Sequence, residues 1–343
     1  MRCYDKLLGR GVADPAPLDR ERTMKRLNYR AICIGAILVG FLAVALFFWL
    51  PRPDRDRELL QVLPPEADLY AVADLESLQN NPAVRRFLSD PAAFSVEEEY
   101  KRFVEATGFR YQDHLRRVAA ARLGSDWVGV ANVTWEREKI LRYLESQGGE
   151  KSKEQGQTIY SFGRLRRFRL ALIGTDLAMF AIGEDGALLR QALARRSGKI
   201  TDSAVAELDR ANDWSYIPKG SAFWAVASMD RLRRSASWEP RIGPFALGDN
   251  VLRGSQAIYL SVQSGLLQLD LQLQNRCDSP GTAARVARTV EGLASLLRTV
   301  PSHQSKSFED KLVVLLAGVS VQQVQESVFL RWKWDAETLR KLE

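Results

Sequence analysis

Residues 63–78 read LPPEADLYAVADLESL, and residues 217–232 read IPKGSAFWAVASMDRL. The two stretches align without gaps, and five of sixteen positions are identical. Each begins with a proline turn, continues as a mostly apolar segment of strand length and then places an acidic residue where a helix would open. The sequence therefore contains an internal repeat of a strand followed by a helix.

The two halves of the chain also end alike. Residues 176–190 and 326–340 both have the pattern of a strand, a turn and a helix. A repeat of about 150 residues is far longer than the unit of a solenoid. We therefore predict a duplicated α+β module, with the first copy at 63–212 and the second at 213–343.

The strands are predicted to form antiparallel sheets. In the segment 256–274, Leu267, Leu269, Leu271 and Leu273 alternate with polar residues, and this period of two is typical of a sheet with one solvated face. We expect helices on the opposite face. The predicted strands are 68–74, 117–123, 127–134, 158–162, 165–173, 177–182, 221–228, 256–263, 266–274, 319–325 and 328–334. The predicted helices are 75–89, 95–107, 136–147, 185–196, 280–299, about 307–316 and a final one, with a polar loop at 150–157.

A long apolar run precedes the repeat. Residues 31–50, AICIGAILVGFLAVALFFWL, include no charge, and a helix of that length spans roughly 30 Å, the thickness of the bilayer core. We predict a transmembrane helix at 31–50, in contact with the lipid bilayer, a flexible cytoplasmic tail at 1–30 and a charged stalk at 51–62. The alternatives are a cleaved signal peptide and a core helix of a soluble protein.

The charges beside this run predict its orientation. Five Lys or Arg residues lie on its amino side (Arg20, Arg22, Lys25, Arg26 and Arg30) and three on its carboxyl side (Arg52, Arg55 and Arg57). Because basic residues remain preferentially in the cytoplasm, residues 51–343 are expected outside it.

Net charge and cysteine count exclude some classes of protein. The net charge is +7, and residues 1–30 supply +4 of it, eight Lys and Arg less four acids. The remainder of about +3 argues against nucleic-acid binding, for which a strongly basic domain is typical. The three cysteines, Cys3, Cys33 and Cys277, lie in the tail, the apolar run and the folded part, so we expect no disulfide within one chain.

An ordered set of short motifs points to a group of proteins. It comprises Ala106-Thr-Gly-Phe109, His114-Leu115, Trp135-Glu-Arg-Glu-Lys-Ile140, Ile159-Tyr160, Leu170-Ala-Leu172 and the segment 187–198. In this order they resemble a group of uncharacterised bacterial proteins, many of them from acidobacteria, over residues 62–240. That group has an Asp at the position of His114 and Phe-Asp at Trp135-Glu136. The resemblance implies a protein anchored in the bacterial inner membrane with its bulk in the periplasm, and it implies no activity.

The chain offers few residues for catalysis or metal binding. It has two histidines, His114 and His303, and their spacing with the cysteines does not make a zinc site. Asp113 and His114 are adjacent, so on a strand their side chains would point to opposite faces. Gly318-Val-Ser-Val-Gln322 lacks the second glycine of a hydrolase elbow. We therefore expect no catalytic residue, no metal and no cofactor.

Two clusters are candidates for binding. Arg164, Arg166, Arg167 and Arg169 form the densest group of cations. They could contact anionic headgroups, an anionic envelope polymer or an acidic partner, or they could protect an edge strand from pairing. The other cluster is an aromatic and aliphatic stripe on one strand face, which is either a packing surface or a partner contact: Val328, Leu330, Trp332 and Trp334.

Taken together, these features favour a membrane-anchored extracytoplasmic binding or scaffold protein that is not an enzyme. Its partner would be an envelope protein or an anionic envelope component. The alternatives are an enzyme whose site consists of scattered carboxylates and arginines, and an envelope protein that binds an apolar ligand or lipid. Such an enzyme should have a deep pocket that holds two or more acids with shifted pKa values.

Overall fold

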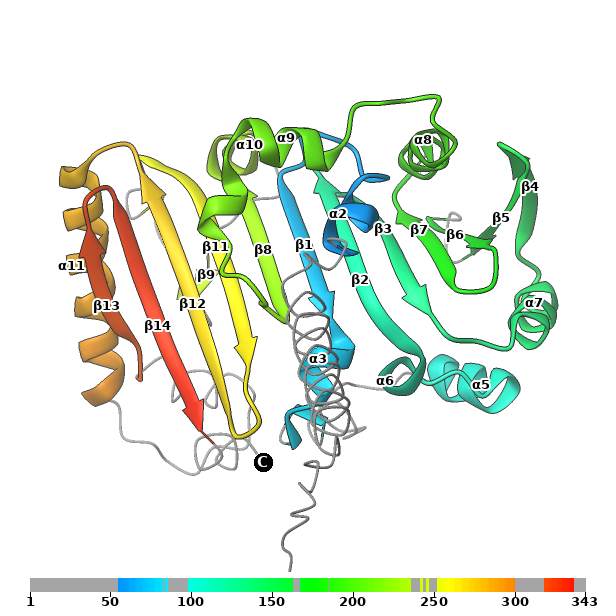
Figure 1. Ribbon diagram of the computed structural model, residues 1–343, viewed down its shortest axis with the longest axis horizontal. Helices are drawn as coiled ribbons and strands as arrows, with labels where there is room; N and C mark the ends of the chain where they lie inside the picture. Colours follow the sequence, from blue (N-terminus) through cyan, green and yellow to red (C-terminus); the bar gives the residue numbers. More distant parts are fainter. Residues whose placement is uncertain are drawn as a thin grey trace, which may run out of the picture. The chain divides into compact units, whose positions relative to one another are not determined.

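The computed structural model describes residues 55–82, 84–85, 98–162, 167–184, 186–235, 241–242, 245–246, 252–299 and 318–335 (Figure 1). The tail predicted at 1–30, the transmembrane helix predicted at 31–50, the helix at about 307–316 and the final helix lie outside these residues.

Within the described residues, twelve strands form one sheet in the order β13-β14-β12-β11-β8-β1-β2-β3-β7-β6-β5-β4. Every neighbouring pair is antiparallel. The strands are β1 (Leu69–Asp74), β2 (Leu115–Leu123), β3 (Asp126–Val133), β4 (Glu150–Glu154), β5 (Gln157–Phe162), β6 (Phe168–Ile173), β7 (Leu177–Ile182), β8 (Phe223–Ser228), β11 (Ser255–Ser264), β12 (Gln268–Cys277), β13 (Ser320–Val324) and β14 (Ser327–Asp335). A separate hairpin pairs β9 (Arg241–Ile242) with β10 (Phe245–Ala246).

Short helices connect the strands, and one long helix follows β12. The helices are α2 (Arg55–Leu60), α3 (Leu75–Gln79), α5 (Glu98–Thr107), α6 (Tyr111–His114), α7 (Arg137–Ser146), α8 (Ala187–Arg196), α9 (Ala204–Arg210), η2 (Asp213–Tyr216, a 3-10 helix), α10 (Met229–Arg234) and α11 (Pro280–Thr299).

Local sequence explains where α11 lies. Ser279 caps its first turn by accepting a hydrogen bond from the Thr282 N–H at 3.3 Å, and Pro280 occupies the first helical position, where no amide proton is needed. Its buried apolar residues and the partly buried Val290 lie on one side of the helix and form an apolar stripe: Ala283, Val286, Ala287, Val290 and Ala294. This stripe packs against β12, β13 and β14.

Both faces of the sheet carry helices. On the first face, Val128 and Val130 of β3 lie in one core with residues of α2, α8 and α9. On the second face, Ala131 and Val133 of the same strand lie in another core with Ile140 of α7. The strand register from β3 across to β14 places the α11 core on this second face as well.

The two copies of the repeat pair with each other at the centre of the sheet. In the β1–β8 ladder Ala71 lies opposite Ala225, and these two residues are the same position of the repeat. Val72 lies opposite Trp224, and Tyr70 lies opposite Val226. The ladder therefore has a local two-fold axis that passes between Ala71 and Ala225.

The predicted fold class is wrong. We expected a transmembrane helix followed by two sheet modules with helices on one face, whereas the halves share one continuous sheet that has helices on both faces. The physical reason is that β1 and β8, the first strand of each copy, bond to one another and leave no sheet edge between the halves. Among the described helices, none combines the length and the apolar character that a membrane crossing needs, and the prediction of a single-pass membrane protein is not carried further.

Candidate functional site: buried acid clusters and two sheet edges

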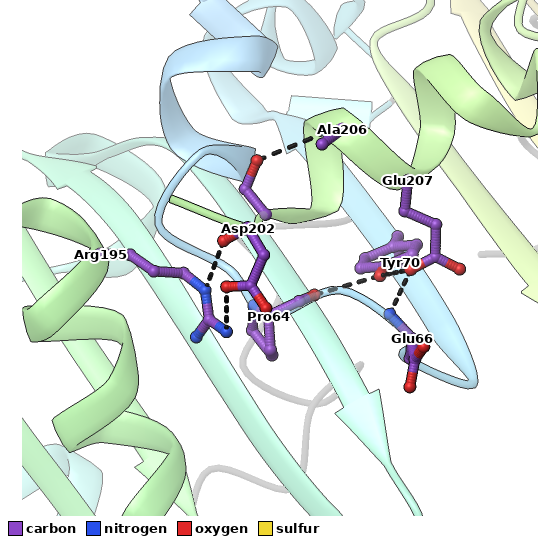
Figure 2. Close-up of polar contacts among 8 residues, drawn as sticks. Pro64, Glu66, Tyr70, Arg195, Asp202, Ala206 and Glu207 are labelled. Carbon is purple, nitrogen blue, oxygen red and sulfur yellow. Dashed lines mark hydrogen bonds and ion pairs between the residues drawn. The ribbon is translucent and has the colours of Figure 1, made fainter. Parts of the chain in front are cut away.

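Glu207 of α9 is the centre of a buried polar cluster on the first face (Figure 2). Its carboxylate accepts hydrogen bonds from the Tyr70 hydroxyl, at 2.7 Å, and from the backbone N–H of Glu66. Arg231 of α10 forms an ion pair with Glu207 and donates to the Ala67 carbonyl at 3.0 Å. The cluster therefore ties the turn before β1 to α9 and to α10 of the second copy.

This arrangement leaves Glu207 little capacity for catalysis. Its oxygens already accept from a hydroxyl, an amide and a guanidinium. Burial is the main cause that raises the pKa of Tyr70 above its ordinary value, so its hydroxyl stays protonated and acts as a hydrogen-bond donor at neutral pH. We interpret the cluster as a structural clamp.

A second cluster surrounds Trp224 on the same face. The Trp224 indole N–H donates to Asp56 of α2 at 2.9 Å, and Asp56 also forms an ion pair with Arg117 of β2 at 2.6 Å. Arg117 in turn pairs with Asp74 at the end of β1. These bonds fix the start of α2 on the sheet.

The two clusters are reciprocal. Tyr70 and Trp224 occupy the same position of the repeat. Tyr70 bonds to an acid of α9, the helix shortly before the second copy, whereas Trp224 bonds to an acid of α2, the helix before the first copy. An ion pair of 2.6 Å between Arg57 and Asp209 also connects α2 to α9. Each of these two side chains thus bonds to the helix that precedes the other repeat stretch.

Asp213 in η2 forms a third cluster. It accepts a hydrogen bond from the Tyr259 hydroxyl at 2.6 Å. The Tyr259 ring is stacked on Tyr216 with centroids 4.8 Å apart, and the Arg276 guanidinium lies 5.2 Å from the Tyr216 centroid. Burial is the largest influence on Asp213 and raises its pKa, although Tyr259 and Arg276 act in the opposite direction.

The raised pKa of Asp213 predicts a pH-dependent stability. Below the ordinary pKa of 3.8 the Asp213 carboxyl is protonated in both the folded protein and the unfolded chain. As the pH rises above it, the unfolded chain ionises first, so the free energy of unfolding falls until the folded carboxyl has ionised too. We expect Asp213→Asn to reduce this fall. Urea unfolding of the unsubstituted protein and of Asp213→Asn, between about pH 4 and pH 7, measures how the free energy of unfolding changes with pH. The same change with pH in the two proteins would contradict the prediction.

The predicted arginine cluster is only partly described. Arg164 and Arg166 lie outside the described residues. Arg169 donates to the carbonyl oxygens of Gly183 and Glu184 at 2.8 and 2.7 Å, and Arg167 pairs with Glu184 at 3.4 Å. These contacts hold the turn between β7 and α8. Binding of an anionic partner by the cluster stays a prediction.

The turn beside Arg169 requires a glycine. Gly186 precedes α8 with a φ of +68°, a left-handed conformation that favours glycine. A Cβ at this position would also come within 2.6 Å of the Arg169 side chain. The conformation of this turn thus depends on both residues.

Other arginines of the chain form ion pairs away from this turn. The Arg195 side chain is only 5% exposed and pairs with Asp202 at 3.1 Å. Figure 2 shows this contact between α8 and the segment before α9. Arg233 pairs with Asp230 within α10. Arg195, Arg231 and Arg233 are thus each paired with an acid of their own.

The remaining sequence candidates have structural surroundings. His114 is stacked on Phe109 with centroids 5.4 Å apart, and Asp113 pairs with Arg110 at 2.6 Å. Cys277 is buried, and burial raises the pKa of its thiol. Val328, Leu330 and Trp332 are buried with residues of α11, which confirms the packing alternative for this stripe. His303 lies outside the described residues.

An open hollow of about 310 Å³ lies between α5 and α7. It is lined by Ala106, Lys139, Arg142, Tyr143 and Ser146, none of which is an acid. The described part of the chain also has no cluster of three or more His, Cys, Asp or Glu that could hold a metal ion. The acids of the three clusters above are instead occupied by hydrogen bonds and ion pairs.

The two edges of the sheet differ in charge. β4, at one edge, has the sequence EKSKE and carries four charges. β13, at the other edge, has the sequence SVQQV and carries none. Four of its five residues are exposed, including Val324, at 46%. Native proteins commonly protect edge strands with charges, and within the described residues only β4 has that protection.

Comparison with known proteins gives only distant similarity. No protein-family description and no curated protein sequence matches the chain. Three crystal structures of the protein TP0453, crystal forms III, I and IV, align with this chain with TM-scores of 0.45, 0.43 and 0.43. Their sequence identities are 10%, 10% and 12%, and the alignments cover 82–83% of this chain and 94–96% of the other. This similarity says nothing about what the present chain binds.

Proposed function

We propose that this protein is a non-catalytic binding protein in which the sheet serves as a scaffold and the β13 edge contacts a protein partner. The observation that carries the proposal is the exposed, uncharged edge strand at the end of a sheet whose opposite edge is charged. The acids of the three clusters support it further, because hydrogen bonds and ion pairs within the fold already occupy them.

The β13 edge suits strand addition. The hairpin of β13 and β14 closes through the Val324–Ser327 pair around a two-residue turn. Such a closing pair is hydrogen-bonded, and bonding alternates along an antiparallel ladder. Ser320, Gln322 and Val324 therefore bond to β14, whereas Val321 and Gln323 direct their N–H and C=O groups away from it. An extended segment of a partner could bond to these groups.

Site-specific photo-crosslinking tests the proposal. A photoreactive amino acid replaces Gln322, in the middle of β13, in the full chain within the cells that produce it. The control carries the same group at Gln191, an exposed residue of α8. We expect a protein adduct at position 322 and none at 191. If position 322 gives no adduct, or both give the same ones, the proposed function is wrong.

A further inference from the structure

We infer that the partner at the β13 edge is the β13 strand of a second copy of this chain, an inference that rests on the proposed function. The two strands would pair antiparallel about a two-fold axis perpendicular to the sheet. The sheets of the two copies would then continue into each other. Three features of β13 support this pairing: the register that symmetry allows, the charges that it brings together and the space beside the strand.

Symmetry restricts the register. In an antiparallel pair, opposite residues share a face, so the axis must pass between a residue and its own copy. Only an axis at Gln322 pairs all five residues, with Ser320 opposite Val324 and Val321 opposite Gln323 of the second copy. In this register Val321 and Gln323, whose backbone groups point outward, form the hydrogen-bonded pairs. The geometry of the pair therefore agrees with the bonding pattern of β13.

Charge distinguishes the two edges. The symmetric register of β13 brings no charged side chains opposite each other. The equivalent pairing of two β4 strands about Ser152 would place Glu150 opposite Glu154 and Lys151 opposite Lys153. Like charges directly opposite each other destabilise a ladder. Self-pairing is thus opposed at the β4 edge and unopposed at the β13 edge.

The helix beside β13 leaves room for a second copy. Figure 1 shows α11 beside β13 and β14, and it packs on β12, β13 and β14. It therefore lies over the middle strand, β14. In the joined sheet the two β14 strands are three strand spacings apart, about 14 Å. Packed helices need about 8–10 Å, so both copies of α11 fit on the second face.

A charge exchange tests the pairing in solution. Ser320→Glu with Val324→Lys places opposite charges across the axis, whereas Ser320→Glu with Val324→Glu places like charges there. We expect the first double variant of the full chain to stay dimeric in analytical ultracentrifugation. The second should have a dimer dissociation constant about tenfold higher or more. Circular dichroism checks that both fold.

Cysteine crosslinking tests the register. With Cys3 and Cys33 changed to serine, Gln322→Cys should form a covalent dimer on mild oxidation, because opposite non-hydrogen-bonded residues have Cα atoms about 4.5 Å apart. Gln191→Cys in the same background should not. A protein that is monomeric at every concentration, or equal dimerisation of the two double variants, overturns the inference. A photo-crosslinked adduct that contains a different protein overturns it too, but leaves the proposed function intact.

Discussion

The Trp224→Ala variant is expected to lose about 3–5 kcal/mol of its free energy of unfolding. Trp224 is 2% exposed and lies in the centre of the first-face core. Its ring makes an edge-to-face contact with Trp214 at a centroid distance of 5.6 Å, and its N–H bonds to Asp56. Alanine would leave a cavity beside the β1–β8 ladder and an Asp56 oxygen without this donor. Urea unfolding followed by circular dichroism measures the loss.

The Trp224→Phe variant separates the two causes. Phenylalanine keeps most of the ring contact but removes the hydrogen bond to Asp56, so we expect a smaller loss of about 1–2 kcal/mol. If Trp224→Ala costs no more than Trp224→Phe, the packing contribution that we assign to the indole ring is wrong.

The Glu207→Ala variant is expected to lose about 3 kcal/mol. Removing the carboxylate takes this acceptor from the Arg231 guanidinium, the Tyr70 hydroxyl and the Glu66 N–H. Arg231 keeps its bond to the Ala67 carbonyl, and the Tyr70 hydroxyl can still donate to the Pro64 carbonyl at 3.1 Å. The Glu207 and Arg231 side chains are 12% and 26% exposed, so water can replace the lost partner only in part. The same unfolding measurement gives the value.

Asp209→Ala is the matched control for Glu207→Ala. Asp209 lies on the same helix and pairs with Arg57, but both side chains are at least 40% exposed. An exposed pair of this kind contributes about 0–1 kcal/mol. Equal losses in the two variants would mean that Glu207 contributes no more than a surface ion pair, which would contradict the clamp.

Periodic segments could be predicted well from the sequence. The helix predicted at 280–299 has the bounds of α11, and the predicted hairpin at 256–274 corresponds to β11 and β12. These segments carry a strong period of 3.6 or 2, which depends only on neighbouring residues. In contrast, β4 was predicted as a loop, because an edge strand that is exposed on both faces has no apolar alternation.

The errors concern contacts between distant segments. The composition of α2 suggested a stalk, although its Leu59 and Leu60 are buried. The near-continuous apolar sequence of β3, DWVGVANV, was a signal that helices cover both of its faces, and we expected only one. The sequence made Arg169 a candidate for partner binding. Its contact with Gly183 could not be predicted, because this contact depends on the pairing of β6 with β7. The open edge at β13 could not be predicted either, because it depends on the order of the strands in the sheet.

The pairing of Ala71 with Ala225 suggests how such a chain could have arisen. Equivalent positions of the repeat lie opposite each other, so two separate polypeptides, each with a single copy, could form the same ladder as a homodimer. Gene duplication and fusion would turn that association into an intramolecular one, whose stability no longer depends on protein concentration. With α2 and α9 each counted to the repeat stretch that it precedes, the bonds Tyr70–Glu207 and Trp224–Asp56 would then be former subunit contacts.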